Sequence, residues 1–341
     1  MEYSREVVRT ARSEASAGGL NPSLVTAQHL WDALSESGVK FITNPNNPYE
    51  TVSEDPSFPV DYTQFPRDTL KLKSGQCDDL STLLAALLES SRVRSALLDF
   101  PGHMALMFDT ETDDPLEVGL PAEDLVPHDG TYWVPVEATM VGRPLNEAVR
   151  KAAYAYRTED AKGAVKVIDA RRAWAAFEPA TLPRTEWAPE VPAAEERHKR
   201  SKTGLAFWAK ERYRFLKAHF QELIKKNPQD LEALNELGVL EHEAGNKGDA
   251  RKRFGQVLAI DNGDASAWNN LGTLEFLAGD FAAAEADYLK ATGADPADPE
   301  AWLNLTRCAL KLMNPEKAKQ YSAKAVSLDP GLAPAVETWL K

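Results

Sequence analysis

The chain has few cysteines and no long apolar run. Only Cys77 and Cys308 occur among its 341 residues, and they lie in segments of different character. Two such cysteines argue against a disulfide framework, and without a CxxC spacing they match no zinc-ligand pattern. No apolar stretch approaches the roughly 18 to 20 residues that a membrane-spanning helix requires. The sequence therefore predicts a protein without a transmembrane segment.

Positive charge is also scarce. The chain has 39 Lys and Arg against 52 Asp and Glu, a formal net charge of -13. Nucleic-acid affinity depends on neutralising phosphates with Lys and Arg, so we expect no nucleic-acid partner. The first residues show no basic segment leading into an apolar one, so no signal peptide is recognised. We expect a soluble protein of the cytoplasm, or of the periplasm or cell envelope if the sequence is a piece of an exported protein.

The last third of the sequence repeats every 34 residues. The segment Ala233–Gly238 aligns with Ala267–Gly272 and then with Ala301–Thr306. Small residues recur later in each unit, at Ala250, Ala284 and Ala318. This pattern resembles the tetratricopeptide repeat, whose period is 34 residues. The resemblance implies an all-α solenoid over residues 204–341, with about three units and partial ends, whose groove docks a protein or peptide. A purely structural spacer is the alternative.

One repeat departs from this pattern. Gly245 and Gly279 recur at the same place in two units, whereas the next unit has Leu312-Met313-Asn314 there. Because methionine lacks the conformational freedom of glycine, we expect an irregular last helix turn in that unit. Cys308 lies among leucines on a repeat helix, so we expect a buried small apolar residue rather than a reactive thiol.

The composition changes abruptly over residues 178–203. Prolines recur at Pro179, Pro183, Pro189 and Pro192, and a charged stretch follows. Proline fixes its own φ and lacks an N–H donor, so this density disfavours both helix and sheet. We therefore expect a Pro-rich linker over 178–203, between a domain of residues 1–177 and the repeats of 204–341. The charged end of the linker is most simply a solvated helix start.

The domain of residues 1–177 contains Cys77 in a distinctive position. Leucines follow it at helical spacing, at Leu80, Leu83, Leu84, Leu87 and Leu88. This spacing predicts an amphipathic helix that begins at or near Cys77, with Gly75 in the entry turn. The amide donors and the positive end of the helix dipole favour a thiolate at such a position.

A histidine and an acid follow Cys77 in segments that we expect to be strands. His103 lies in the turn between predicted strands 93–100 and 104–108, and Glu137 lies in a third predicted strand, 131–138. A helix before a small antiparallel sheet is an α+β arrangement. A cysteine, a histidine and a carboxylate brought together in this way are the components of a nucleophilic catalytic site.

Gly75, Cys77, Asp79 and His103 together resemble the core of the transglutaminase-like superfamily, relatives of the papain-like cysteine proteases. The resemblance covers residues 65–140. It implies an α+β papain-like domain with Cys77 as nucleophile, His103 as base and Glu137 as the acid that orients the histidine, where the family usually carries Asp.

The resemblance implies a cysteine peptidase or amide hydrolase that acts on a protein or peptide without a cofactor. Transamidation is one alternative, and a catalytically inactive fold used for binding or assembly is another. An oxyanion hole would use the Cys77 amide and a second donor, which we expect within residues 41–64.

Asp78 and Asp79 are weak candidates for calcium binding. Some bacterial transglutaminase-like proteases bind calcium through acids that flank the cysteine. Here Gln76 precedes Cys77 in place of an acid, which would leave such a site incomplete. The residues favour a helix-capping role for Asp79.

Overall fold

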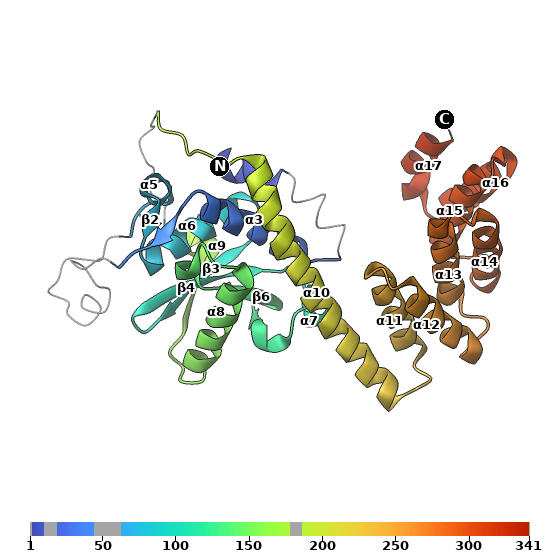
Figure 1. The fold of residues 1–341 in the computed structure, drawn as a ribbon, viewed down its shortest axis with the longest axis horizontal. Coiled ribbons are helices and arrows are strands. Elements are labelled where there is room, and N and C mark those ends of the chain that lie inside the picture. The colour runs from blue at the N-terminus through green and yellow to red at the C-terminus, as the bar shows by residue number, and fades with distance from the viewer. Residues whose placement is uncertain (1, 10–18, 44–62, 178–185, 341) are drawn as a thin grey trace. The chain divides into compact units, whose positions relative to one another are not determined.

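The computed structural model describes residues 2–9, 19–43, 63–177 and 186–340, which form two compact units (Figure 1). The first unit is Met1–Phe215 and the second is Leu216–Lys341. Among the described residues, no helix has both the length and the apolar character needed to cross a membrane.

The first unit combines helices with short strands. Its elements up to the strand that carries His103 are α1 (Glu2–Val8), α3 (Pro22–Glu36), β1 (Lys40–Phe41), α5 (Pro66–Leu72), β2 (Ser74–Gly75), α6 (Cys77–Ser90), β3 (Ser95–Phe100) and β4 (His103–Asp109). They are followed by α7 (Pro115–Val118), β5 (Val126–His128), β6 (Thr131–Val136), α8 (Leu145–Asp160), β7 (Lys166–Asp169) and α9 (Ala170–Ala176).

Five strands form an antiparallel sheet in the order β5-β6-β4-β3-β7. At the turn between β3 and β4, Phe100 lies opposite His103, and further along β4 Leu106 lies opposite Val136 of β6. Helix α6 precedes this sheet in the chain and contacts β3 and β4. The expected α+β arrangement is therefore present, with the helix and three strands close to the predicted positions.

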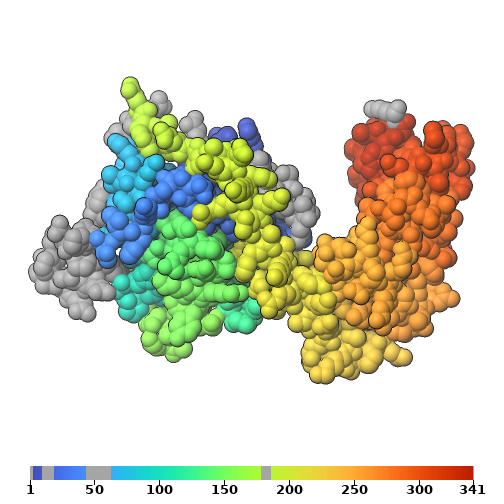
Figure 2. Space-filling model, in the orientation of Figure 1, coloured from blue at the N-terminus to red at the C-terminus, as the bar shows by residue number. Residues whose placement is uncertain are grey.

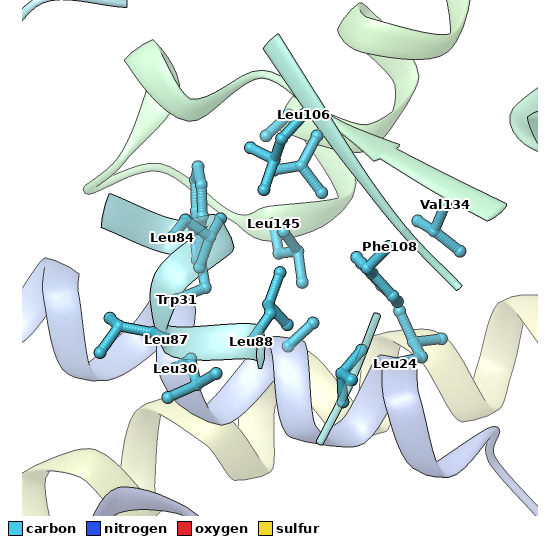
Figure 3. Close-up of a cluster of buried hydrophobic side chains, with 14 of the residues drawn as sticks. Leu24, Leu30, Trp31, Leu84, Leu87, Leu88, Leu106, Phe108, Val134 and Leu145 are labelled. Carbon is cyan, nitrogen blue, oxygen red and sulfur yellow. The ribbon is translucent and has the colours of Figure 1, made fainter. Parts of the chain in front are cut away.

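The sheet separates two apolar clusters. Side chains of β4 alternate between them: Leu106 and Phe108 enter the larger cluster, while Ala105 and Met107 enter the smaller one. This is the period of two that a strand imposes on its side chains. Figure 3 shows Leu106 and Phe108 beside side chains from α3, α6 and α8, including Trp31, Leu88 and Leu145. The larger cluster thus fixes α6, and with it Cys77, against the strand that begins with His103.

Helix α10 (Ala194–Lys226) begins inside the segment expected to be a linker. Residues 186–193 are irregular, but residues 194–203 are helical. Trp208 is buried in the larger cluster, and its Nε1 donates to Oε1 of Gln28 at 2.8 Å. Figure 2 shows the yellow-green start of α10 on the surface of the first unit. The structural division therefore falls at Phe215, beyond the sequence-based boundary at residue 203.

The second unit is entirely helical within its described residues. It contains α11 (Leu231–Glu243), α12 (Lys247–Ile260), α13 (Ala265–Ala278), α14 (Phe281–Ala294), α15 (Pro299–Lys311), α16 (Pro315–Leu328) and α17 (Ala333–Trp339), with a short turn of 3-10 helix before α17. The recurring alanines at 250, 284 and 318 are fully buried. A Cβ on Gly272 would meet the Tyr288 ring at 2.7 Å, so the paired helices α13 and α14 approach closely there.

The expected irregular turn in the last full repeat does not occur. Met313 adopts a left-handed φ of 55°, in the position where Gly245 has 81° and Gly279 has 87°. In all three turns the residue that follows donates its backbone N–H to the carbonyl five residues earlier. In the last repeat this bond joins Asn314 N–H to the Ala309 carbonyl at 2.9 Å. The expectation was wrong because the turn geometry recurs with the repeat even where a non-glycine residue must adopt it.

Candidate functional site

Cys77 is the first residue of α6 and is half-buried. The helix begins there because Asp79 accepts hydrogen bonds from two backbone amides, those of Gln76 at 2.8 Å and Gln64 at 2.6 Å. Ser81 Oγ donates to the Met104 carbonyl at 3.3 Å and so links the first turns of α6 to the start of β4. Asp79 thus has the capping role that the sequence indicated.

Gly75 makes the close approach before Cys77 possible. Its carbonyl accepts the Ile42 amide at 3.0 Å, which places it in the small parallel pair of β1 and β2. A Cβ at this position would lie 2.6 Å from Cβ of Asp79. Any side chain here would therefore displace the residue that caps the Cys77 helix.

His103 lies at the start of β4, between Cys77 and Glu137. Its Nε2 is 2.7 Å from Oε2 of Glu137, and its ring stacks on Phe100 with centroids 6.4 Å apart. The Cys77 side chain is the other neighbour of the ring and the largest cause of the raised pKa of His103. Because Nε2 is engaged by Glu137, Nδ1 is the ring nitrogen that remains for Cys77. The Cys77 and Glu137 side chains beside the ring raise the pKa of His103 to about 9, so the ring is an imidazolium at neutral pH.

Glu137 directly follows β6, and its side chain is only 1% exposed. Oε1 accepts from the Thr139 amide at 3.2 Å and from its hydroxyl at 2.5 Å. Lys151 Nζ, on α8, lies 3.9 Å from Oε2. Burial favours a higher pKa for Glu137, but the hydrogen bond and charge of His103, with Thr139 and Lys151, outweigh it and lower that pKa.

The structure brings together the three side chains that the sequence selected as a triad. The family that the sequence resembles usually has aspartate at this position. The glutamate at position 137 is one methylene longer, and it also forms the hydrogen bond to the histidine. A cysteine beside an imidazolium, with a buried carboxylate hydrogen-bonded to the ring, has the components that can generate a nucleophile and deliver a proton to a leaving group.

The predicted calcium candidates are engaged in protein hydrogen bonds. Asp78 accepts from Thr63 Oγ1 at 2.8 Å, and Asp79 accepts the two amides described above. Within the described residues, no group of three or more His, Cys, Asp or Glu side chains is arranged to hold a metal ion. Of residues 41–64, where we expected an oxyanion donor, 44–62 lie outside the described part of the chain.

Sequence reasoning missed two neighbours of Glu137. Thr139 follows Glu137 by two residues, and acidic side chains commonly accept a hydrogen bond from a backbone amide two residues later. The sequence therefore contained a signal for this contact. Lys151 lies on a different element, and no local pattern links it to Glu137.

The second unit has a groove of its own, which we call the array groove. Its cavity is about 590 Å³ and is lined by α11, α13 and the residues around the start of α15. The lining residues are Leu231, Glu232, Asn235, Glu236, Val239, Asp264, Ser266, Asn269, Asn270, Asp298 and Glu300. First helices of successive repeats thus contribute equivalent surfaces to one groove.

Comparison with protein families identifies the second unit. Two tetratricopeptide repeat family models match the chain, one over residues 202–267 and 243–299 and the other over 275–337. The C-terminal part is therefore a tetratricopeptide-repeat solenoid, as its 34-residue period predicted. These matches begin within α10, so its second half takes part in the repeat pattern.

Several solved structures are similar to part of the chain. MamA has 22% sequence identity and a TM-score of 0.33, covering 41% of this chain and 77% of its own. The Yersinia enterocolitica type III secretion chaperone SycD, in complex with a peptide of the translocator YopD, has 22% identity and a TM-score of 0.31, covering 32% and 88%. The first tetratricopeptide domain of Spaghetti, bound to an HSP90 peptide, has 19% identity and a TM-score of 0.31, covering 33% and 90%. No curated protein matches the chain.

Proposed function

We propose that the repeat solenoid of this protein docks a segment of a partner protein in the array groove. The observation that carries this proposal is the match of residues 202–337 to tetratricopeptide repeats, together with a groove of about 590 Å³ along their first helices. Stacked repeats present extended concave surfaces of the kind that bind other chains.

Selection of random displayed peptides on the full-length protein tests the docking proposal. Peptides enriched on the native protein should lose binding to Asn269→Arg, which obstructs the groove. They should keep binding to Asn262→Arg, a matched change at an exposed asparagine outside the groove lining. Absence of enriched peptides, or binding that survives Asn269→Arg, would exclude docking in this groove.

A second function concerns the first unit, for which we propose amide hydrolysis by a Cys77–His103–Glu137 triad of the transglutaminase-like type. The supporting observation is that His103 is hydrogen-bonded to the buried Glu137 and that the neighbouring Cys77 is the largest cause of its raised pKa. A docked partner protein would be the natural source of the substrate amide.

The proposed reaction proceeds through a thioester. The Cys77 thiolate attacks the amide carbonyl carbon, and His103 donates its proton to the departing amine as the C–N bond breaks. Water then attacks the thioester while His103 accepts its proton, which releases a carboxylic acid and restores the thiolate. Glu137 holds the ring throughout and stabilises its positive charge.

Two measurements test this proposal and separate its alternatives. Cys77 should react faster than Cys308 with an alkylating reagent at neutral pH, because Cys308 is buried and burial raises its pKa to about 12. Incubation with a peptide mixture and a labelled amine should give products whose mass reports hydrolysis, and Cys77→Ser should abolish them. Amine incorporation would indicate transamidation instead, and no product of either kind would leave a binding or assembly module.

A further inference from the structure

The array groove is lined by acidic side chains and contains no basic ones. Its lining includes five acids, Glu232, Glu236, Asp264, Asp298 and Glu300, and no Lys, Arg or His. Two of these acids recur at the repeat period: Asp264 and Asp298 cap α13 and α15 in equivalent positions. The negative charge is therefore built into successive repeats and follows the length of the groove.

None of these five acids has a basic partner within the described residues, whereas several other acids of the solenoid do. Elsewhere in the repeat unit, Glu241 pairs with Lys217 and Glu285 with Lys317, each at 2.8 Å, and Glu275 pairs with Arg251. Among the described residues, no Lys, Arg or His forms an ion pair with any of the five groove acids. Burial and the neighbouring charges of Glu232 and Glu243 raise the pKa of Glu236, as expected where negative charge is uncompensated.

Asparagines also belong to the groove lining, among them Asn235 and Asn269. Asn235 Nδ2 donates to Asp264 at 3.3 Å, and one repeat later Asn304 Nδ2 donates to Asn269 Oδ1 at 3.1 Å. Oδ1 of Asn235 is buried and accepts no hydrogen bond within the described residues. This oxygen belongs to a residue of the groove lining and has no partner in the described part of the chain, and carboxamides bind main chain whatever its sequence.

We propose that the partner segment docked in the array groove is an extended, Lys- or Arg-rich stretch of a protein. This inference rests on the proposed docking function and adds the chemistry of the partner. Lys and Arg side chains of the segment pair with the five acids, which have no basic partner among the residues that the structure describes. The asparagines bind the backbone of the segment between these side chains. Complementary charge of this kind steers association and excludes acidic segments.

Binding of a labelled peptide to the full-length protein tests the proposal. The probe is a short fluorescein-labelled peptide of alternating Lys and Ala, and an alternating Glu and Ala peptide serves as the negative control. The Lys peptide should bind in fluorescence anisotropy, weaken as salt is raised, and bind about tenfold more weakly to the triple variant Glu232→Gln, Glu236→Gln, Glu300→Gln.

A matched triple variant separates the groove from the overall charge of the protein. Asp249→Asn, Glu316→Gln and Glu337→Gln remove the same three charges from exposed residues outside the groove and should leave binding within about twofold of the native value. Equal weakening by both triple variants, or no binding of the Lys peptide, would overturn the proposal. Displayed peptides that need Asn269 but carry no positive charge would overturn it too, while leaving the docking function intact.

Discussion

Nε2 of His103 lies 2.7 Å from Oε2 of Glu137, a carboxylate whose side chain is 1% exposed. A buried carboxylate costs stability unless it is hydrogen-bonded and paired with positive charge. Here the Thr139 amide and hydroxyl satisfy one oxygen, and His103 meets the other. The pair therefore depends on a protonated ring, and this dependence leads to the first two predictions.

Replacing Glu137 by glutamine should lower the pKa of His103. The substitution removes the negative charge that stabilises the imidazolium but keeps nearly the same shape. We expect a fall from about 9 towards the ordinary value of 6.5, measured by NMR titration of the ring. Glu147→Gln, at an exposed residue of the first turn of α8, is the control and should leave the titration unchanged. An unshifted His103 in Glu137→Gln would contradict the pairing.

Stability around β4 should fall as pH rises through about 9. His103 has a folded-state pKa of about 9 against an ordinary value of 6.5, so its contribution is complete below about 6.5. Above that pH the unfolded chain releases the proton first, and the contribution is lost as pH passes the folded value. Hydrogen exchange of β4 peptides, corrected for intrinsic rates, should show this loss in the native protein and a smaller one in His103→Asn. Equal pH dependence in both proteins would exclude the ring as its source.

Gly75→Ala should destabilise the first unit and slow alkylation of Cys77. The added Cβ would lie 2.6 Å from Asp79 Cβ and 3.2 Å from Thr69 Cγ2, so the capping residue has to move. We expect a cost of about 1 to 3 kcal/mol, the range for overpacking a close contact. Gly255→Ala in α12, where no atom lies within 4 Å of the new Cβ, should not have this effect. Thermal denaturation and the alkylation rate measure the two outcomes.

Met313→Gly should stabilise the second unit. Met313 is 89% exposed, so its side chain contributes little packing, and its φ of 55° lies in the left-handed region. Removing the strain of that conformation should raise the free energy of unfolding by about 1 kcal/mol. The greater conformational entropy of glycine in the unfolded chain reduces this gain. The denaturant midpoint of the solenoid should rise, whereas Gly279→Met, the reverse change one repeat earlier, should lower it. A lower midpoint for Met313→Gly would mean that the methionine makes contacts that stabilise the turn.

The sequence predicted those features that local patterns encode. The leucine spacing after Cys77 located α6 and placed its start at or near Cys77, which is its first residue. The repeat period located the solenoid because each unit repeats the same close contacts, such as Gly272 against Tyr288. The order of Cys77, His103 and Glu137 selected three side chains that the fold brings together, although their catalytic role is still a prediction.

Features that depend on distant partners were not predicted. Strands β5 and β7 are three and four residues long, too short for alternation to be recognised, and they exist because β6 and β3 offer edges to pair with. The linker was expected to extend to residue 203 because its prolines dominate the composition, although its charged end was interpreted as a solvated helix start. What orders that segment is contact with the first unit, and Gln28 lies 180 residues away from Trp208.

The burial of Trp208 sets a limit on how this chain can be divided. The proline-rich segment looks like the natural place to separate the N-terminal and repeat portions, yet a fragment that stops at residue 177 or 203 would lose the indole that fills the core beside α3. If the repeats were exchanged at that point, the N-terminal unit would lack Trp208, and apolar core residues would be exposed to solvent. The exchangeable piece of this protein therefore begins after Phe215, part-way along a helix, and not at the prolines.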